Sequence, residues 1–296
     1  VSVVNMSLSW PRAYDTQDVR SAVKEAIQKG VIIVASAGND RKKEPTFPCS
    51  YEGVICVGSV SIDGSMSVFS DFGSHIDILG PGDDIVSTYP TTRVSSALRF
   101  QKYETMSGTS QASPHVAGII ATLRSAYPQM SADEIKARLY SSSMEIPESG
   151  SSLYGMARLD RIFTAPTTPV FYPHFKTITP AVLDEKSLQA SGAFDFENLG
   201  VAAHDVRVEV SINGGAPVST QIGDLNPLQK TSITWKHAFA SLDDSADLKL
   251  ILRVFDSTGF RRQFETHLET ARKLDSAGAV HTQSADKAIA GIDLDN

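Results

Sequence analysis

The chain has 296 residues, which is enough for a full hydrophobic core and two domains. With 41% hydrophobic and 21% charged residues, its composition is that of an ordinary globular protein. The net charge of -7, with no basic cluster longer than Arg41-Lys42-Lys43, argues against a nucleic-acid partner. No apolar run approaches the roughly 20 residues that a membrane helix needs, so we expect no membrane span.

The first 35 residues have the pattern of a β-α-β unit. Residues 1–6 are mostly apolar and residues 31–35 entirely so, and they predict two buried strands. Residues 15–28 carry apolar side chains at helical spacing and end before Gly30. Such a connection is right-handed and joins parallel strands. Because the first strand opens the sequence without a charged leader, we expect this chain to be the C-terminal part of a longer polypeptide.

A Gly-Thr-Ser turn at residues 108–110 precedes an apolar run that predicts a helix. Ser110 then lies at the helix N-terminus, where backbone N–H groups lack intrahelical partners. The helix dipole and the Ser110 N–H favour negative charge beside the Ser110 Oγ, which makes this hydroxyl a candidate nucleophile. The α/β-hydrolase turn is excluded, because it needs a glycine where Ala112 stands.

Asn39 follows the second predicted strand, at the edge where open parallel sheets place their ligands. Its side-chain amide can donate a hydrogen bond to an oxyanion, and Gly38 before it allows a substrate to approach closely. We therefore expect Asn39 and Ser110 to act in one site.

Residues 108–118 read Gly-Thr-Ser-x-Ala-x-Pro-His-Val-Ala-Gly and resemble the nucleophile motif of the subtilisin-like serine proteases. The resemblance covers residues 1–164 and implies a three-layer α/β domain with a parallel sheet. It implies a serine endopeptidase in which Ser110 forms the acyl-enzyme and Asn39 is the side-chain half of the oxyanion hole. His115 is structural in this family, although its spacing from Ser110 suggests a catalytic pair.

The resemblance also implies the residues that contact a peptide substrate. These are Ser7, Leu8, Ser9, Ser36, Ala37, Gly38, Gly108 and Thr109. Ser9 departs from the family, which usually has glycine there, so a side chain at this position narrows the pocket or alters specificity.

The catalytic Asp and His of this family lie in Asp-x-Gly and His-Gly-Thr-His motifs upstream of the Ser7 segment, and neither motif occurs in this sequence. We therefore expect an incomplete catalytic domain, with the Asp and His supplied by a separate N-terminal chain or a missing upstream segment. The family implies a protein substrate and an inhibitory propeptide as further partners. The alternative is a non-catalytic pseudoprotease fragment or a binding module.

Cys49 and Cys56 fit either a disulfide or two free buried thiols. The disulfide is favoured, and it implies an oxidising compartment and thus a secreted or extracytoplasmic protein. No histidine or carboxylate stands near the cysteines at zinc-site spacing, so we expect no metal ligands and no cofactor. The resemblance leaves room for a weak structural cation, such as calcium, on backbone carbonyls of residues 47–53.

Residues 88–105 form a longer and more basic connection than the family usually has. A flap or docking surface and a solvated insertion both fit it, and the solvated insertion is favoured.

The second half of the chain has the period of β-strands. Residues 165–173 contain three prolines and predict a linker. Alternating apolar residues then predict strands at 192–198, 206–212, 230–235 and 248–255, with a hairpin turn at 213–215. We expect an all-β sandwich over residues 174–270 and a mobile, polar tail over 271–296.

Overall fold

The computed structural model describes residues 1–89, 103–146, 150–178, 181–184, 188–239, 247–272 and 281–282. It divides into two compact units. The first comprises Val1–Val170 and Leu199–Val201, and the second comprises Phe171–Asn198 and Ala202–Asn296. The division falls inside the predicted linker at residues 165–173.

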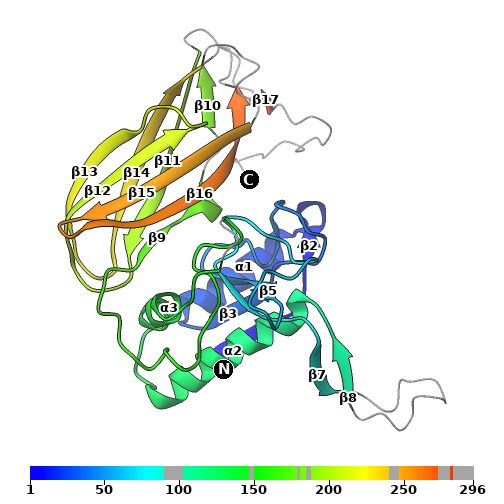
Figure 1. The fold of residues 1–296 in the computed structure, drawn as a ribbon. Helices are drawn as coiled ribbons and strands as arrows, with labels where there is room; N and C mark the ends of the chain where they lie inside the picture. Colours follow the sequence, from blue (N-terminus) through cyan, green and yellow to red (C-terminus); the bar gives the residue numbers. More distant parts are fainter. Residues whose placement is uncertain are drawn as a thin grey trace. The chain divides into compact units, whose positions relative to one another are not determined.

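A sheet of parallel strands forms the centre of the first unit (Figure 1). Its order is β1 (Val3–Met6), β3 (Ile32–Ser36), β5 (Ile55–Val60) and β6 (Ile78–Pro81), and each neighbouring pair runs parallel. β3 and β5 are buried along their whole length, as strands with helices on both faces must be. The prediction of a parallel sheet is confirmed.

In the described part of this unit, three α-helices accompany the sheet: α1 (Gln17–Gln28), α2 (Thr109–Ala126) and α3 (Ala132–Ser141). Val23 of α1 belongs to a core cluster with Ile33 and Leu79, whereas Val116 of α2 packs beside Gly80, the next residue of β6. Because successive residues of a strand point to opposite faces, α1 and α2 cover different faces of the sheet. Among the described residues, no helix is both long enough and apolar enough to cross a membrane.

Short elements surround this sheet. η1 (Arg12–Tyr14) is a single 3-10 turn, β2 (Trp10–Pro11) pairs with β4 (Thr46–Phe47), and β7 (Ile85–Thr88) pairs with β8 (Tyr103–Met106). β8 leads into the N-terminus of α2 (Figure 1). The predicted insertion at 88–105 therefore begins and ends in paired strands, and residues 90–102 lie outside the described residues.

The described part of the second unit is built from strands with one 3-10 turn, η3 (Phe175–Thr177). The strands are β9 (Phe171–Pro173), β10 (Ala181–Asp184), β11 (Gln189–Asn198), β12 (Ala203–Ile212), β13 (Val218–Leu225), β14 (Gln229–Ala238), β15 (Asp247–Asp256), β16 (Gly259–Arg272) and β17 (His281–Thr282). Hydrogen bonds connect them in the order β13-β12-β15-β16-β10-β11-β14, with β9 on β11 and β17 on β16. This unit is therefore all-β in its described residues.

Two boundaries differ from the sequence-based expectation. Phe171–Pro173, placed in the linker by its prolines, forms β9, because its backbone pairs with the end of β11. Residues 271–272 and 281–282 of the expected mobile tail lie in β16 and β17, and the rest of 271–296 lies outside the described residues. The turn at Asn213-Gly214 joins β12 to β13 with φ of 49° and 73°, so the predicted hairpin is confirmed.

Ile55 tests how much the sheet contributes to stability. Its side chain is wholly buried in β5, between β3 and β6. We expect Ile55→Ala to lower the free energy of unfolding by about 2–5 kcal/mol, since it leaves a cavity that the flanking strands cannot close. Urea unfolding measures this as a lower midpoint at an unchanged slope.

Ile62→Ala is the matched control, because the Ile62 side chain is fully exposed. It should change the free energy of unfolding by no more than about 0.5 kcal/mol. Equal effects of the two variants would contradict the described core.

Candidate active site

Three chain segments meet where β1 and β3 end and α2 begins. The Ser7 hydroxyl, after β1, donates to the backbone carbonyl of Ser110 at 2.7 Å. The Gly38 N–H, after β3, donates to the Thr109 hydroxyl at 3.1 Å. The structure therefore brings together residues that the sequence places far apart, as the carboxyl edge of a parallel sheet predicts.

Asn39 is bound to the first residue of α2 through two hydrogen bonds. Its Oδ1 accepts from the Thr109 N–H at 2.8 Å and from the Thr109 hydroxyl at 2.9 Å. Both partners are donors, so the oxygen end of the amide must face Thr109. The other end of the amide, Nδ2, is left to donate elsewhere.

Ser110 is the second residue of α2, and its side chain is half-buried. Within the described part of the chain, neither its N–H nor the Asn39 Nδ2 donates to a protein acceptor. A Cβ on Gly108 would lie 3.2 Å from Asn39 Nδ2 and 2.9 Å from Gln111 Oε1, so the space between these groups depends on glycine. Within the described residues, the Ser110 N–H and Asn39 Nδ2 are thus two donors without a protein acceptor, on segments that Thr109 bonds together.

The predicted substrate walls divide into exposed and buried parts. Leu8 and Ser9 are exposed, and Leu8 is 57% accessible. The side chains of Ser36 and Ala37 are buried, and the Ser36 hydroxyl donates to the Leu8 carbonyl at 3.4 Å. If the segment at Ser36 contacts a substrate, it does so through its backbone. The substrate-binding roles themselves stay predictions.

A chain of side-chain hydrogen bonds that sequence reasoning missed connects β1 to α2. The Asn5 amide donates to the Ser7 hydroxyl at 3.0 Å, and the Ser113 hydroxyl donates to Asn5 Oδ1 at 2.6 Å. Ser7 in turn bonds the Ser110 carbonyl. The Ser7 hydroxyl therefore binds the start of α2. No sequence signal marks the two bonds to α2, since Ser7–Ser110 and Asn5–Ser113 each join positions more than 100 residues apart.

Asp71 is a further residue that sequence reasoning missed. Its side chain is 1% exposed, and its Oδ1 accepts the N–H groups of Asp40 and Lys42 at 2.9 Å each. Burial raises the pKa of the Asp71 carboxyl above its usual range, although the two N–H bonds act in the opposite direction. In the sequence, Asp71 stands in a turn that reads as purely structural.

His115 lies on the exposed surface of α2, where its Nδ1 is 2.8 Å from the Gln111 carbonyl oxygen. This hydrogen bond is thus within its own helix and does not involve Ser110. The structural role implied by the resemblance stays a prediction.

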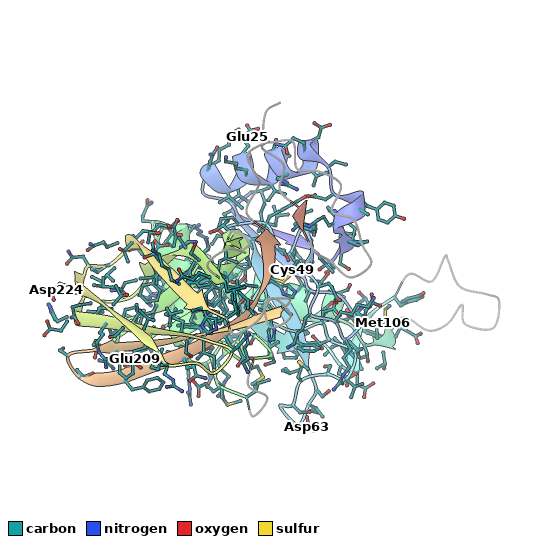
Figure 2. All side chains as sticks on the ribbon, turned by 90° about the horizontal axis from the view of Figure 1, so that it is seen from above. Glu25, Cys49, Asp63, Met106, Glu209 and Asp224 are labelled. Carbon is teal, nitrogen blue, oxygen red and sulfur yellow. A yellow bond between two sulfur atoms is a disulfide. The ribbon has the colours of Figure 1, made fainter. Side chains whose placement is uncertain are left out.

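The Sγ atoms of Cys49 and Cys56 are bonded to each other, so the pair is a disulfide (Figure 2). It joins the segment after β4 to β5 inside the core of the first unit. Among the residues that the structure describes, no group of three or more His, Cys, Asp or Glu side chains could hold a metal ion. A cation on backbone carbonyls is a different kind of site and stays a prediction.

The family model described as the subtilase family matches residues 1–167. The major intracellular serine protease of Bacillus subtilis (strain 168) is 38% identical over 130 residues, covering 42% of this chain and 37% of that protein. Subtilisin DY of Bacillus licheniformis is 34% identical over 153 residues, covering 50% and 52%. Thermitase of Thermoactinomyces vulgaris is 36% identical over 146 residues, covering 49% and 48%. The chain spans between 37% and 52% of the length of these relatives.

A substitution of Thr109 can remove hydrogen bonds of the site while Ser110 itself is unchanged. Thr109→Val keeps the shape of the side chain but leaves the buried Gly38 N–H without its acceptor. We expect the free energy of unfolding to fall by about 1–3 kcal/mol, because the Gly38 N–H loses its hydrogen bond and stays buried away from water. Chemical denaturation measures the change.

Thr109→Ser is the matched control, since it keeps the hydroxyl and removes only the methyl group. It should retain most of the stability lost in Thr109→Val. If the two variants were equally destabilised, the hydroxyl would not be the group that matters.

Proposed function

This chain belongs to the subtilase family, and on that premise we propose that it supplies the nucleophile and the oxyanion donors of a serine endopeptidase. The observation that carries the proposal is a pair of donors, the Ser110 N–H and Asn39 Nδ2, that no protein acceptor uses within the described residues, with Asn39 bonded to Thr109, the residue before Ser110. A binding scaffold has no need of this arrangement.

In the proposed reaction, the Ser110 Oγ attacks the carbonyl carbon of the scissile peptide bond and gives up its proton to a base. The carbonyl oxygen becomes an oxyanion, which accepts hydrogen bonds from the Ser110 N–H and Asn39 Nδ2. Collapse expels the amine, which takes the proton from the base, and leaves an acyl-enzyme on Ser110. A water molecule, activated by the same base, then releases the acid product.

The base and its carboxylate partner come from outside this sequence, as an upstream segment or as a separate chain. The pairing and the incomplete burial of β1 support this. In the described residues β1 pairs only with β3, and its apolar side chains Val3, Val4 and Met6 are half-exposed, whereas β3 and β5 are fully buried. A parallel strand of this composition is normally covered on both faces. The segment that carries the Asp and His would cover it.

We further infer that the second unit is a β-sandwich. Alternate residues of its strands are buried, and they are Val206, Val208, Val210 and Ile212 of β12, Leu248, Leu250, Leu252 and Val254 of β15, Phe194 and Phe196 of β11, and Ile233 and Trp235 of β14. One buried face per strand is what two packed sheets require. β16 pairs with both β15 and β10, so it can connect the two layers.

The disulfide supports an extracytoplasmic location, because such bonds persist in oxidising compartments. The names of the relatives do not decide the matter, since one of them is called intracellular.

A fluorophosphonate serine probe, followed by intact mass spectrometry of the denatured native protein, tests the nucleophile. We expect this chain to be labelled at Ser110, because an activated hydroxyl attacks phosphorus in the same way as a peptide carbonyl. Ser110→Ala should lose the label and about 10⁶-fold in kcat, while its unfolding midpoint stays unchanged.

Ser65→Ala is the control, because Ser65 lies in a turn after β5 and bonds only within that turn. It should label like the wild type. Retained turnover in Ser110→Ala would contradict the assignment. An unlabelled wild type without any partner bearing the Asp and His motifs would favour the non-catalytic alternative.

Asn39→Ala tests the oxyanion donor. We expect kcat to fall by about 10²–10³-fold, the loss that follows removal of one such donor from a subtilisin. KM should change by less than about threefold, because the donor bonds the transition state more strongly than the bound substrate. A change confined to KM would contradict this role.

A further inference from the structure

The turn that carries Asn39 is held from two sides. Thr109 bonds Asn39 itself, and Asp71 bonds the residues around it. The Asp71 N–H donates to the Gly38 carbonyl at 3.0 Å, and the Asp71 Oδ1 accepts the N–H groups of Asp40 and Lys42 at 2.9 Å each. Both chain neighbours of Asn39 are therefore bonded to one residue of a different segment.

The fit between Asp71 and this turn is tight. A Cβ on Gly38 would lie 2.1 Å from Asp71 Oδ2, and Gly38 has a φ of +121°. The second carboxylate oxygen thus occupies the space that any other residue at position 38 would fill. The backbone of the turn therefore approaches the Asp71 carboxylate more closely than a side chain at position 38 would allow.

The Asp71 carboxylate is buried at a position where a neutral amide would cost less free energy to bury. The charged groups that face it are Asp40 and Lys42, which form an ion pair with each other at 3.2 Å near the surface. Its raised pKa means that the charged form costs folding free energy above that pKa, and that stability rises as the pH falls through it. What a charge adds over an amide is hydrogen bonds of roughly twice the strength.

We propose that Asp71 is a positioning residue for the oxyanion donor, and that its carboxylate fixes the turn at Gly38, Asp40 and Lys42 so that Asn39 Nδ2 is in place before the substrate arrives. The proposal rests on the function proposed above. It assigns Asp71 a role in turnover that acts only through Asn39, without contact with the substrate.

A double-mutant cycle in the full, active protein tests this. Asp71→Asn keeps the acceptor oxygen but removes the charge, and we expect it to lower kcat by about tenfold, less than the 10²–10³-fold ceiling set by losing the donor itself. KM should stay within about twofold. In the Asn39→Ala background the same substitution should lower kcat by less than about twofold, since the group that it positions is gone. An equal loss in both backgrounds would overturn the proposal.

Stability and hydrogen exchange separate positioning from a structural role. At neutral pH, Asp71→Asn should keep or raise the urea midpoint while kcat falls, because it removes the cost of a buried charge. The amides of Asp40 and Lys42 should exchange several-fold faster. A lowered midpoint with unchanged kcat would show a structural residue and overturn the proposal.

Asp77→Asn is the matched control. Asp77 is also fully buried, and its Oδ2 accepts the Cys56 N–H at 2.7 Å, away from the Asn39 turn. The kcat of Asp77→Asn should stay within about twofold of the wild-type value. A tenfold loss of kcat in this variant would contradict a specific role for Asp71. A wild type that neither labels at Ser110 nor cleaves peptides would overturn the proposed function and this inference together. If the wild type is labelled at Ser110 and Asp71→Asn has the same kcat as the wild type, only this inference is overturned.

Discussion

Two hydrogen bonds from Thr109 to the Asn39 side chain hold the candidate site together. They join the end of β3 to the first residue of α2, and they occupy the amide oxygen so that Nδ2 remains available. The Thr109 hydroxyl also accepts the Gly38 N–H, which ties the segment after β3 to the helix. Two of these three bonds share Asn39 Oδ1 and two share the Thr109 hydroxyl, so Gly38, Asn39 and the first residue of α2 form one hydrogen-bonded unit.

The sheet makes this junction possible by bringing the helix close. α2 starts against the edge formed by β6 and the residues after it, where a Cβ on Gly80 would lie 3.0 Å from the Ala112 carbonyl oxygen and one on Gly82 would lie 2.7 Å from the Gly108 carbonyl oxygen. Larger residues at these glycines would push the helix away from β3. On the other side, Asn5 and Ser7 of the β1 segment bond the helix start. The start of α2, which carries Ser110, is thus held by contacts with the segments of β1, β3 and β6.

Short sequence patterns predicted those elements that are determined by interactions within a few residues. Asn213-Gly214 marks the hairpin between β12 and β13, because a turn of this kind is decided within a few residues. β9 was missed, since the prolines around it read as a linker and only pairing with β11 makes it a strand. Asp71 was missed for the same reason, because its partners lie on another loop.

The sequence by itself determined the residue types of the site and their order. A serine after Gly-Thr at a helix start and an asparagine after Gly at a strand end are both short patterns, and each chemistry depends on groups within a few residues. Only the tertiary structure decided what each polar group bonds. Ser7, read as a substrate contact, is bonded to the Ser110 carbonyl, and Asp71, read as a turn residue, holds the loop around Asn39. Such pairings depend on how the strands and α2 pack, and side-chain periodicity along the chain does not encode them.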